Sequence, residues 1–290
     1  MCGIAGFIGW EGRDDQVENL IKNSQTSLYH RGPDAKGFWL SKKDKIIFIH
    51  TRLSILDLSK SGNQPMQSSC ERFIVSFNGE IYNHLQLREE LKLYRKNIKW
   101  NSTSDTETLL ESIAIIGLDT TLSKIRGMFV FSLYDKKNKK VYLIRDRYGE
   151  KPLYLLQLNS GIFAFASEIS SFNNIPNFSP NINLKAASCY FQKGYIAAPH
   201  SIWNNVKKIM PGTKTVISLE KNRKYILKSE DVYWSAKEVA FNGQRNLYKG
   251  SYNKCKDDLE SILLEVLKGQ SLSDVPLGVF LSGGIDSSVV

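Results

Sequence analysis

The stretch MCGIAGFIGW, residues 1–10, places a cysteine directly after the initiator methionine and follows it with small and apolar residues. The small side chain of Cys2 permits removal of Met1, after which one residue carries both a thiol and a free α-amine. These groups titrate near pH about 8.5 and about 8, so an unprotonated amine can take the thiol proton and later return it to a leaving amine. The stretch therefore predicts a nucleophile at the chain terminus. The alternative is that Cys2 is a small hydrophobic residue in a first strand.

The bulk properties of the chain are those of an ordinary globular protein. Its 290 residues suffice for one large or two modest domains, and 42% of them are hydrophobic and 23% charged. No run approaches the roughly 18 apolar residues that span a bilayer, and residues 1–10 lack the charged start of a secretory signal. We therefore expect a cytoplasmic protein without membrane association.

Neither the cysteines nor the charges indicate a metal centre or a nucleic-acid partner. The cysteines are scattered without a CxxC pair, which argues against a disulfide framework and a zinc site, and the four histidines show no triad arrangement. The net charge is +10, but the lysines are spread through turns such as SKKDK (41–45) and DKKNKK (135–140). This spread of positive charge is more typical of solvent-exposed loops than of a nucleic-acid-binding surface. The positive net charge remains compatible with an anionic substrate such as a nucleotide.

Strand patterns dominate the first two thirds of the chain. The turn motifs DKKNKK (135–140) and LNSG (158–161) predict antiparallel hairpins, and amphipathic helices are expected from Asp105 to Gly117 and over 259–267. The fold class is therefore α+β, with antiparallel sheets flanked by helices. Runs rich in β-branched and aromatic residues predict strands at 45–56, 72–79, 127–135, 140–146, 152–158 and 161–168.

A second region begins after EDVYW (230–234). Residues 235–251 are polar without a strong period, so we expect a linker before the amphipathic helix. The closing VPLGVFLSGGIDSSVV (275–290) predicts an apolar strand, a Gly-Gly loop and the start of a helix, which together open a βα unit of a parallel sheet. We therefore divide the chain into a domain over 1–235 and a linker with the truncated start of a second domain over 236–290.

Six long and specific strings follow one another along the chain. They are MCGIAGF (1–7), HRGPDAKG (30–37), TRLSILDLSKSGNQPM (51–66), FNGEIYNH (77–84), SDTE (104–107) and RDRYGEKPLYL (145–155). Together, in this order, they resemble the glutamine-amidotransferase domain of the N-terminal-nucleophile type, as found in glutamine-hydrolysing asparagine synthetases. The resemblance implies an αββα sandwich of antiparallel sheets, followed by the start of an α/β ATP-pyrophosphatase domain.

The resemblance assigns the chemistry to three residues. Cys2 would attack the side-chain amide of glutamine, forming a glutamyl thioester and releasing ammonia without a cofactor. Asn78 and Gly79 would donate a side-chain amide and a backbone N–H to the oxyanion, where loss of one donor typically costs about 2.7–4 kcal/mol. The alternative for this Asn-Gly pair is a hairpin turn.

Four further residues would bind the substrate glutamine by the same resemblance. Arg52 would clamp the α-carboxylate through its planar fork, and Ile55 would line the same pocket. Asp105 and Glu80 would hold the α-ammonium. For Asp105 the alternative is a helix N-cap signal in SDTE, and for Glu80 it is an exposed surface charge.

The Gly-Gly loop near the C-terminus resembles the pyrophosphate loop of ATP pyrophosphatases. Glycines let a backbone approach phosphate oxygens, and no GK[ST] follows, so this is not a Walker A loop. An ordinary strand-to-helix turn is the alternative. The residues that would cradle the phosphates of ATP and help place Mg²⁺ are Leu281, Ser282, Gly283, Gly284, Asp286 and Ser287.

In the complete enzyme the resemblance implies that ATP adenylates the carboxylate of aspartate, which ammonia from Cys2 then attacks. Other acceptor carboxylates, such as a sugar acid, a peptide or a β-lactam precursor, stay open because substrate choice lies largely beyond Val290. The alternative from a different class of function is a non-catalytic fragment or a basic RNA-binding protein. Nothing in the sequence decides the oligomeric state, and a homodimer stays open.

Overall fold

Two antiparallel sheets face each other in the computed structural model, which describes residues 1–158, 161–173, 175–176, 178–220 and 224–290. The first sheet has the order β10 (Val206–Lys208), β8 (Tyr154–Gln157), β9 (Phe163–Ala166), β1 (Gly3–Ile8), β3 (Ile46–Arg52) and β2 (Ala35–Ser41). The second has the order β12 (Tyr225–Val232), β11 (Thr213–Leu219), β7 (Lys140–Arg145), β6 (Gly127–Asp135), β5 (Phe73–Ile81) and β4 (Met66–Gln67).

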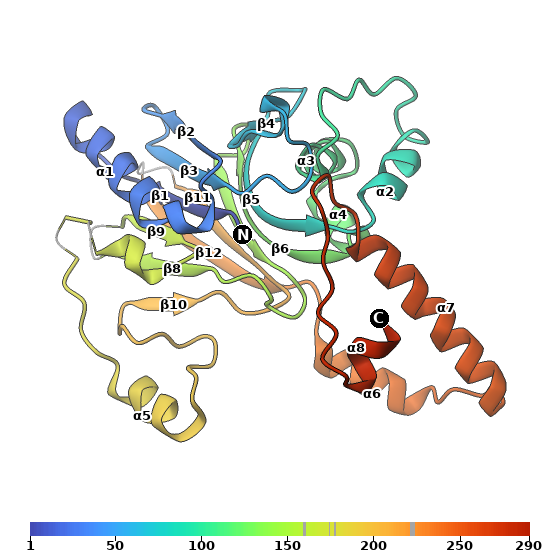
Figure 1. Cartoon of the computed structure of the whole chain (residues 1–290). Coiled ribbons are helices and arrows are strands. Elements are labelled where there is room, and N and C mark those ends of the chain that lie inside the picture. The colour runs from blue at the N-terminus through green and yellow to red at the C-terminus, as the bar shows by residue number, and fades with distance from the viewer. Residues whose placement is uncertain (159–160, 174, 177, 221–223) are drawn as a thin grey trace.

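Helices cover the outer face of each sheet. The core between the sheets contains Phe48 and Phe165 from the first and Tyr134 and Leu143 from the second. Outside the first sheet lies α1 (Asp14–Ser27), and outside the second lie α2 (His84–Leu91), α3 (Asp105–Ile116) and α4 (Leu118–Lys124) (Figure 1). The layers are therefore helix, sheet, sheet and helix, which confirms the predicted αββα sandwich.

Short elements complete this first part of the chain. They are the 3-10 helices η1 (Tyr29–Arg31), η2 (Lys60–Gly62) and η3 (Ile169–Phe172) and the helix α5 (Leu184–Lys193). Within the described ranges, no helix is both long enough and apolar enough to cross a membrane.

The predicted hairpins follow from turn chemistry. β6 and β7 pair in register from Asp135 opposite Lys140, and the Asp135 carboxylate accepts the backbone N–H groups of Lys137 and Asn138 at 3.0 and 3.2 Å. An aspartate that binds the N–H groups that follow it stabilises a turn. β8 and β9 also pair antiparallel, while Asn159 and Ser160 of the predicted LNSG turn lie outside the described residues.

Packing explains the small residues after Cys2. β1 lies between β3 and β9 in the first sheet and is buried along its whole length. A Cβ atom at Gly3 would lie 2.6 Å from Thr51 Oγ1, and one at Gly6 would lie 2.3 Å from Cζ of Phe165. Only glycine fits at these two close approaches. The small residues after Cys2 therefore allow β1 to lie at the centre of the sheet, with Cys2 directly before it.

The C-terminal region differs from the sequence expectation in two places. Residues 236–245 of the expected linker form helix α6 (Ala236–Arg245), whose N-cap is Ser235, with its hydroxyl accepting the N–H of Glu238 at 3.3 Å. The apolar strand expected in residues 275–281 is wrong, since that segment is not a strand. A strand forms by pairing, and no described strand lies beside it to supply the hydrogen bonds.

The predicted amphipathic helix is present as α7 (Tyr252–Gln270), and a short α8 (Ile285–Val289) follows the Gly-Gly loop. In Figure 1 the helices α6 to α8 lie on the side of the molecule away from α1. Arg126 pairs with Glu265 of α7 at 3.1 Å, and the backbone N–H of Asp274 donates to the carbonyl of Ile55 at 2.9 Å. The C-terminal segment therefore returns to the loop after β3.

Candidate active site

A cavity of about 260 Å³ opens where the N-terminus, the end of β3, the middle of β5 and the start of α3 meet. Every residue that the sequence analysis placed at the glutamine site lines it. These residues are Cys2, Arg52, Ile55, Asn78, Gly79, Glu80 and Asp105. The structure thus brings together residues that are more than a hundred positions apart in the chain.

The thiol of Cys2 lies immediately before β1 and is held by the start of the loop after β3. Its sulfur accepts the backbone N–H of Leu53 at 3.4 Å and donates to the carbonyl of Leu53 at 3.5 Å. The Arg31 side chain, itself paired with Glu168 at 2.8 Å, donates Nε–H to the Cys2 carbonyl at 3.1 Å. Burial raises the pKa of the Cys2 thiol, so this nucleophile needs a nearby base at neutral pH.

An amine at the chain start lies beside this thiol. In this structure it belongs to Met1, whose sulfur accepts Nζ–H of Lys151 at 3.3 Å. Burial lowers the pKa of the Met1 amine, and the positive charges of Arg31 and Lys151 lower it further against the opposing effect of Cys2. The surroundings of the chain start thus favour an unprotonated amine, the form that can accept a thiol proton.

Asn78 presents an unused hydrogen-bond donor in the cavity wall. It lies within β5 opposite Val130 of β6, and its side chain is buried. Its Nδ2 has no hydrogen-bond partner in the part of the chain that the structure describes. A buried donor without a partner costs about 1–3 kcal/mol, so its retention at a cavity indicates a ligand oxygen.

Gly79 follows in the same strand, where a larger residue would not fit. A Cβ atom there would lie 2.2 Å from the carbonyl oxygen of Met128 and 2.6 Å from Cα of Phe129. The Asn-Gly pair therefore lies inside β5 and not at a hairpin turn, so the turn alternative considered for it is wrong.

Arg52 ends β3, and its guanidinium binds the loop that follows. Nη1 donates to the carbonyl of Ser59 at 2.7 Å and to Oδ1 of Asn63 at 3.0 Å, while Nη2 donates to the carbonyls of Leu56, at 3.4 Å, and Asp57. All four terminal N–H groups are thus engaged by the protein. A bidentate clamp on a substrate carboxylate would require some of these loop contacts to be exchanged.

Asp105 is the first residue of α3, and Ser104 is the N-cap, with its hydroxyl accepting the N–H of Glu107 at 3.4 Å. The helix start lies at the cavity, so the cap motif and a role in the site are compatible. Asp105 Oδ2 accepts the N–H of Ile81 at 2.8 Å. Burial, with the charge of Glu80 adding to it, raises the pKa of Asp105 to about 7, which an incoming ammonium would lower again.

Glu80 is half-buried and lines the same cavity, so it is not a simple surface charge. Burial raises the pKa of Glu80, against the opposing positive charge of Lys151. Lys151 and Gln64 also line the cavity and were not singled out from the sequence. Each lies inside one of the strings that carry the family resemblance, Lys151 in RDRYGEKPLYL and Gln64 in TRLSILDLSKSGNQPM. Membership of these strings was the sequence signal that could have pointed to them.

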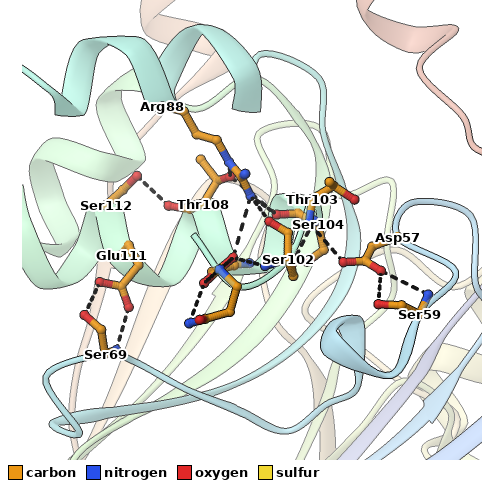
Figure 2. A network of polar contacts seen from close by, with 12 residues as sticks. Asp57, Ser59, Ser69, Arg88, Ser102, Thr103, Ser104, Thr108, Glu111 and Ser112 are labelled. Atoms are coloured by element: carbon orange, nitrogen blue, oxygen red, sulfur yellow. Dashed lines mark hydrogen bonds and ion pairs between the residues drawn. The ribbon is translucent and has the colours of Figure 1, made fainter. Parts of the chain in front are cut away.

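Arg88 of α2 supports the segment that leads into α3 (Figure 2). Its Nη2 donates to the carbonyls of Ser102 and Ser104 at 3.0 and 2.9 Å, and its Nε donates to the hydroxyl of Thr108 at 2.7 Å. Its guanidinium also lies over the ring of Trp100, 4.1 Å from the centroid. These contacts hold the backbone that positions Asp105.

The Gly-Gly loop lies apart from this cavity, since none of its residues line it. Gly283 has a φ of 79°, and the hydroxyls of Ser282 and Ser287 are 2.9 Å apart. Two hydroxyls beside a glycine backbone free of side chains fit phosphate oxygens. Of the six residues expected to bind ATP, only Ser287 is partly buried, and the others are exposed.

Comparison with known families agrees with this geometry. The family model described as glutamine amidotransferase domain matches residues 1–234. The chain belongs to this family of glutamine amidotransferase domains. The model described as asparagine synthase matches residues 258–290. The recognition made from the sequence is thereby confirmed.

Two curated relatives carry names that agree with both matches. A putative glutamine-hydrolysing asparagine synthetase 2 of Methanocaldococcus jannaschii is 34% identical, over 100% of this chain and 56% of that protein. The glutamine-hydrolysing asparagine synthetase 1 of Bacillus subtilis is 32% identical, over 100% of this chain and 43% of that protein. The chain therefore spans about half the length of these relatives.

The fold also matches a solved structure, the glutamine phosphoribosylpyrophosphate amidotransferase of Bacillus subtilis in complex with ADP and GMP. The TM-score is 0.56 at 16% identity, covering 80% of this chain and 49% of that chain. At this identity the match shows a shared fold, and it confirms the class predicted from the sequence.

Proposed function

We propose that this chain hydrolyses glutamine to glutamate and ammonia at Cys2 after removal of Met1. The observation that carries the proposal is the unpaired Nδ2 of Asn78 in the wall of the cavity that also contains the Cys2 thiol. Asp105 and Arg52 supply charges of both signs in the same cavity. A substrate with an amide at one end and an amino acid head at the other matches these groups.

The proposed reaction balances with the groups of this chain. The α-amine of Cys2 takes the thiol proton, and the sulfur bonds to the amide carbon of glutamine. The negative charge that develops on the amide oxygen is stabilised by Asn78 Nδ2–H and the N–H of Gly79. The α-ammonium returns the proton to the nitrogen, which leaves as ammonia. Water then cleaves the thioester and releases glutamate.

In the longer protein we propose that this ammonia amidates a carboxylate, with aspartate as acceptor. Support comes from the asparagine synthase match over residues 258–290 and from the names of the relatives. When bound, ATP would supply activation of the acceptor carboxylate as an adenylate, held together with Mg²⁺ by residues 281–287. Other acceptor carboxylates, a cytoplasmic location and a homodimer stay predictions from the sequence.

The test is ammonia release from glutamine by this chain, compared with its Cys2→Ala and Cys189→Ala variants. Cys189 is an exposed free cysteine and serves as the matched control. We expect Cys2→Ala to abolish ammonia release and Cys189→Ala to leave it unchanged, with mass spectrometry showing that Met1 is absent. Equal rates for wild type and Cys2→Ala would refute the nucleophile, and full activity with Met1 attached would refute the amine as base.

A further inference from the structure

Asp57 has an unusual backbone conformation in the loop between β3 and η2. Its φ is 55°, which a residue with a side chain rarely adopts, and its side chain is buried with a residue exposure of 7%. Such a conformation persists where the surrounding contacts determine it, and it is frequent at functional sites. The contacts of Asp57 therefore indicate what this conformation serves.

The carboxylate of Asp57 joins two segments of the cavity wall (Figure 2). Its Oδ1 accepts the backbone N–H and the hydroxyl of Ser59 at 3.0 and 2.5 Å, and its Oδ2 accepts the N–H of Thr103 at 3.0 Å. Thr103 lies two residues before Asp105. Although burial acts to raise it, hydrogen bonds from Ser59 and Thr103 hold the pKa of Asp57 below its usual value. The carboxylate is therefore charged at neutral pH.

The backbone of the same residue holds Arg52. The carbonyl of Asp57 accepts Nη2–H of Arg52, and the carbonyl of Ser59, which the Asp57 carboxylate orients, accepts Nη1–H at 2.7 Å. One residue thus touches the arginine on one side of the cavity and the segment leading to Asp105 on the other. A shift of Asp57 would move both groups.

The remaining polar group of Asp57 contacts the C-terminal segment. Its N–H donates to Oδ2 of Asp274 at 2.7 Å, and the N–H of Asp274 donates in turn to the carbonyl of Ile55 at 2.9 Å. Asp274 follows α7 and is otherwise exposed. This two-bond clamp ties the region matched by the asparagine synthase model to a loop of the glutamine site.

We propose that Asp57 is a positioning residue that fixes Arg52 and Asp105 relative to each other, and that Asp274 stabilises it from the C-terminal segment. The inference rests on the proposed glutaminase function and assigns Asp57 to the binding of the glutamine head group. Asn78 and Gly79 lie on β5. Among the described residues, the Cys2 thiol hydrogen-bonds only with Leu53, the first residue of this loop, directly after β3. Loss of the Asp57 contacts therefore weakens glutamine binding and leaves the chemical step nearly unchanged.

The first experiment separates KM from kcat for ammonia release in Asp57→Asn. An asparagine has only one acceptor oxygen, so it cannot hold both Ser59 and Thr103. We expect KM for glutamine to rise at least tenfold with kcat within threefold of wild type. The matched control is Asp44→Asn, because Asp44 is 9% exposed and bonds Ser41 and Lys139 but does not line the cavity. It should keep the wild-type KM.

The Asp274 clamp is tested in the same assay with Asp274→Ala, which changes an exposed side chain and leaves the core intact. We expect KM to rise about threefold, because only one of the hydrogen bonds that hold Asp57 is lost. Asp257→Ala is the control, since Asp257 is exposed on α7 and its carboxylate has no partner among the described residues. Unchanged KM in both Asp57→Asn and Asp274→Ala would overturn the proposal.

Alkylation of Cys2 gives a second readout that does not need turnover. A diazoketone analogue of glutamine carries the amino acid head group, whereas iodoacetamide lacks it. Rates are followed on the peptide that contains Cys2 by mass spectrometry. We expect Asp57→Asn to slow the diazoketone at least tenfold and to leave iodoacetamide unchanged.

Equal slowing by both reagents would show a distorted site and overturn the positioning role. A wild-type chain that releases no ammonia would overturn the proposed function. In that case the ratio of the two alkylation rates still decides whether Asp57 acts on head-group binding.

Discussion

At the scale of single residues, the site keeps two groups in states that are unfavourable without a ligand. Asn78 has a buried N–H without a partner among the described atoms, and Asp105 is a buried carboxyl group whose pKa is raised by burial. An unpaired buried donor and a buried carboxylate each lower the stability of the fold, and an amide oxygen and an ammonium group would complement them. Burial also raises the pKa of the Cys2 thiol, which keeps it neutral at neutral pH. Proteins retain such groups where function requires them.

Asp105 makes glutamine use pH-dependent. Its pKa is about 7, so it loses its charge as the pH falls through neutrality. If the charged form binds the α-ammonium, kcat/KM should fall about tenfold per pH unit well below pH 7. Asp105→Asn should have a much lower kcat/KM and should lose the part of this dependence that the carboxyl group contributes, while the part due to protonation of the chain-start amine remains. Initial rates of ammonia release between pH 5 and 8 provide the measurement, and an unchanged profile in the variant would exclude Asp105.

The same carboxyl group affects stability with a defined sign. Its folded pKa of about 7 exceeds the unfolded value near 3.9, so its contribution is fully present below pH about 4 and is lost as the pH rises through 7. Between pH 5 and pH 8, the free energy of unfolding of Asp105→Asn should therefore rise relative to that of wild type by about 2.5 kcal/mol. Urea unfolding at the two pH values measures this difference.

Sequence reasoning named residues that line the cavity around Cys2 and missed residues that hold them in place. Cys2, Asn78 and Asp105 lie in strings whose residue types and order are specific. Gln64 instead acts through contacts formed only in the fold, because its Oε1 accepts the N–H of Phe77 at 2.6 Å and its Nε2 donates to Thr106 at 3.2 Å. No local pattern encodes contacts between positions so far apart, so residues of this kind require the structure.

At the scale of elements, the sequence predicted best those helices and strands whose ends are set by their own residues. β6 was predicted at its observed bounds, Gly127–Asp135, because its apolar residues end at a turn that Asp135 itself stabilises. The strand expected in residues 275–281 was wrong because a strand depends on neighbours, and none is described there. Helix α6 was missed although Ser235 and Glu238 form a capping pattern, since its weak apolar period suggested a linker.

The link between α2 and α3 depends on the planar fork of Arg88. Arg88→Lys should lower the free energy of unfolding by about 1–3 kcal/mol, because one ammonium cannot serve the carbonyls of Ser102 and Ser104, bond Thr108 and lie over Trp100 together. Arg95→Lys is the matched control, since Arg95 is exposed and its side chain has no partner among the described residues, and it should stay within about 0.5 kcal/mol of wild type. Urea titration at fixed pH compares them, and equal midpoints for both variants would exclude the role of the fork.

At the scale of the whole molecule, burial divides the chain into two unequal parts. All buried apolar residues of the described core lie between Ile4 and Tyr225, and α6, α7 and α8 contain no buried residue. The apolar stripe of α7 is exposed, including Leu259, Ile262 and Val266. An apolar helix face of this kind is typical of an element that packs against further structure, as expected of a chain spanning about half of its relatives.

This division predicts where a protease will cut the folded chain. Brief trypsin treatment should cleave first within residues 236–290, where the basic residues are exposed and the helices contain no buried residue, and leave a slower-cleaved fragment ending near residue 235. Exposed lysines also lie in turns of the first part, such as residues 135–140, but buried strands on both sides hold these turns and slow their cleavage. The fragment should lose Asp274 and its bond to Asp57, so its KM for glutamine should rise about threefold while ammonia release continues. Mass spectrometry of the digest and kinetics of the isolated fragment test both statements. Early cuts within the sheets, or a fragment with the KM of the full chain, would contradict the domain division or the clamp respectively.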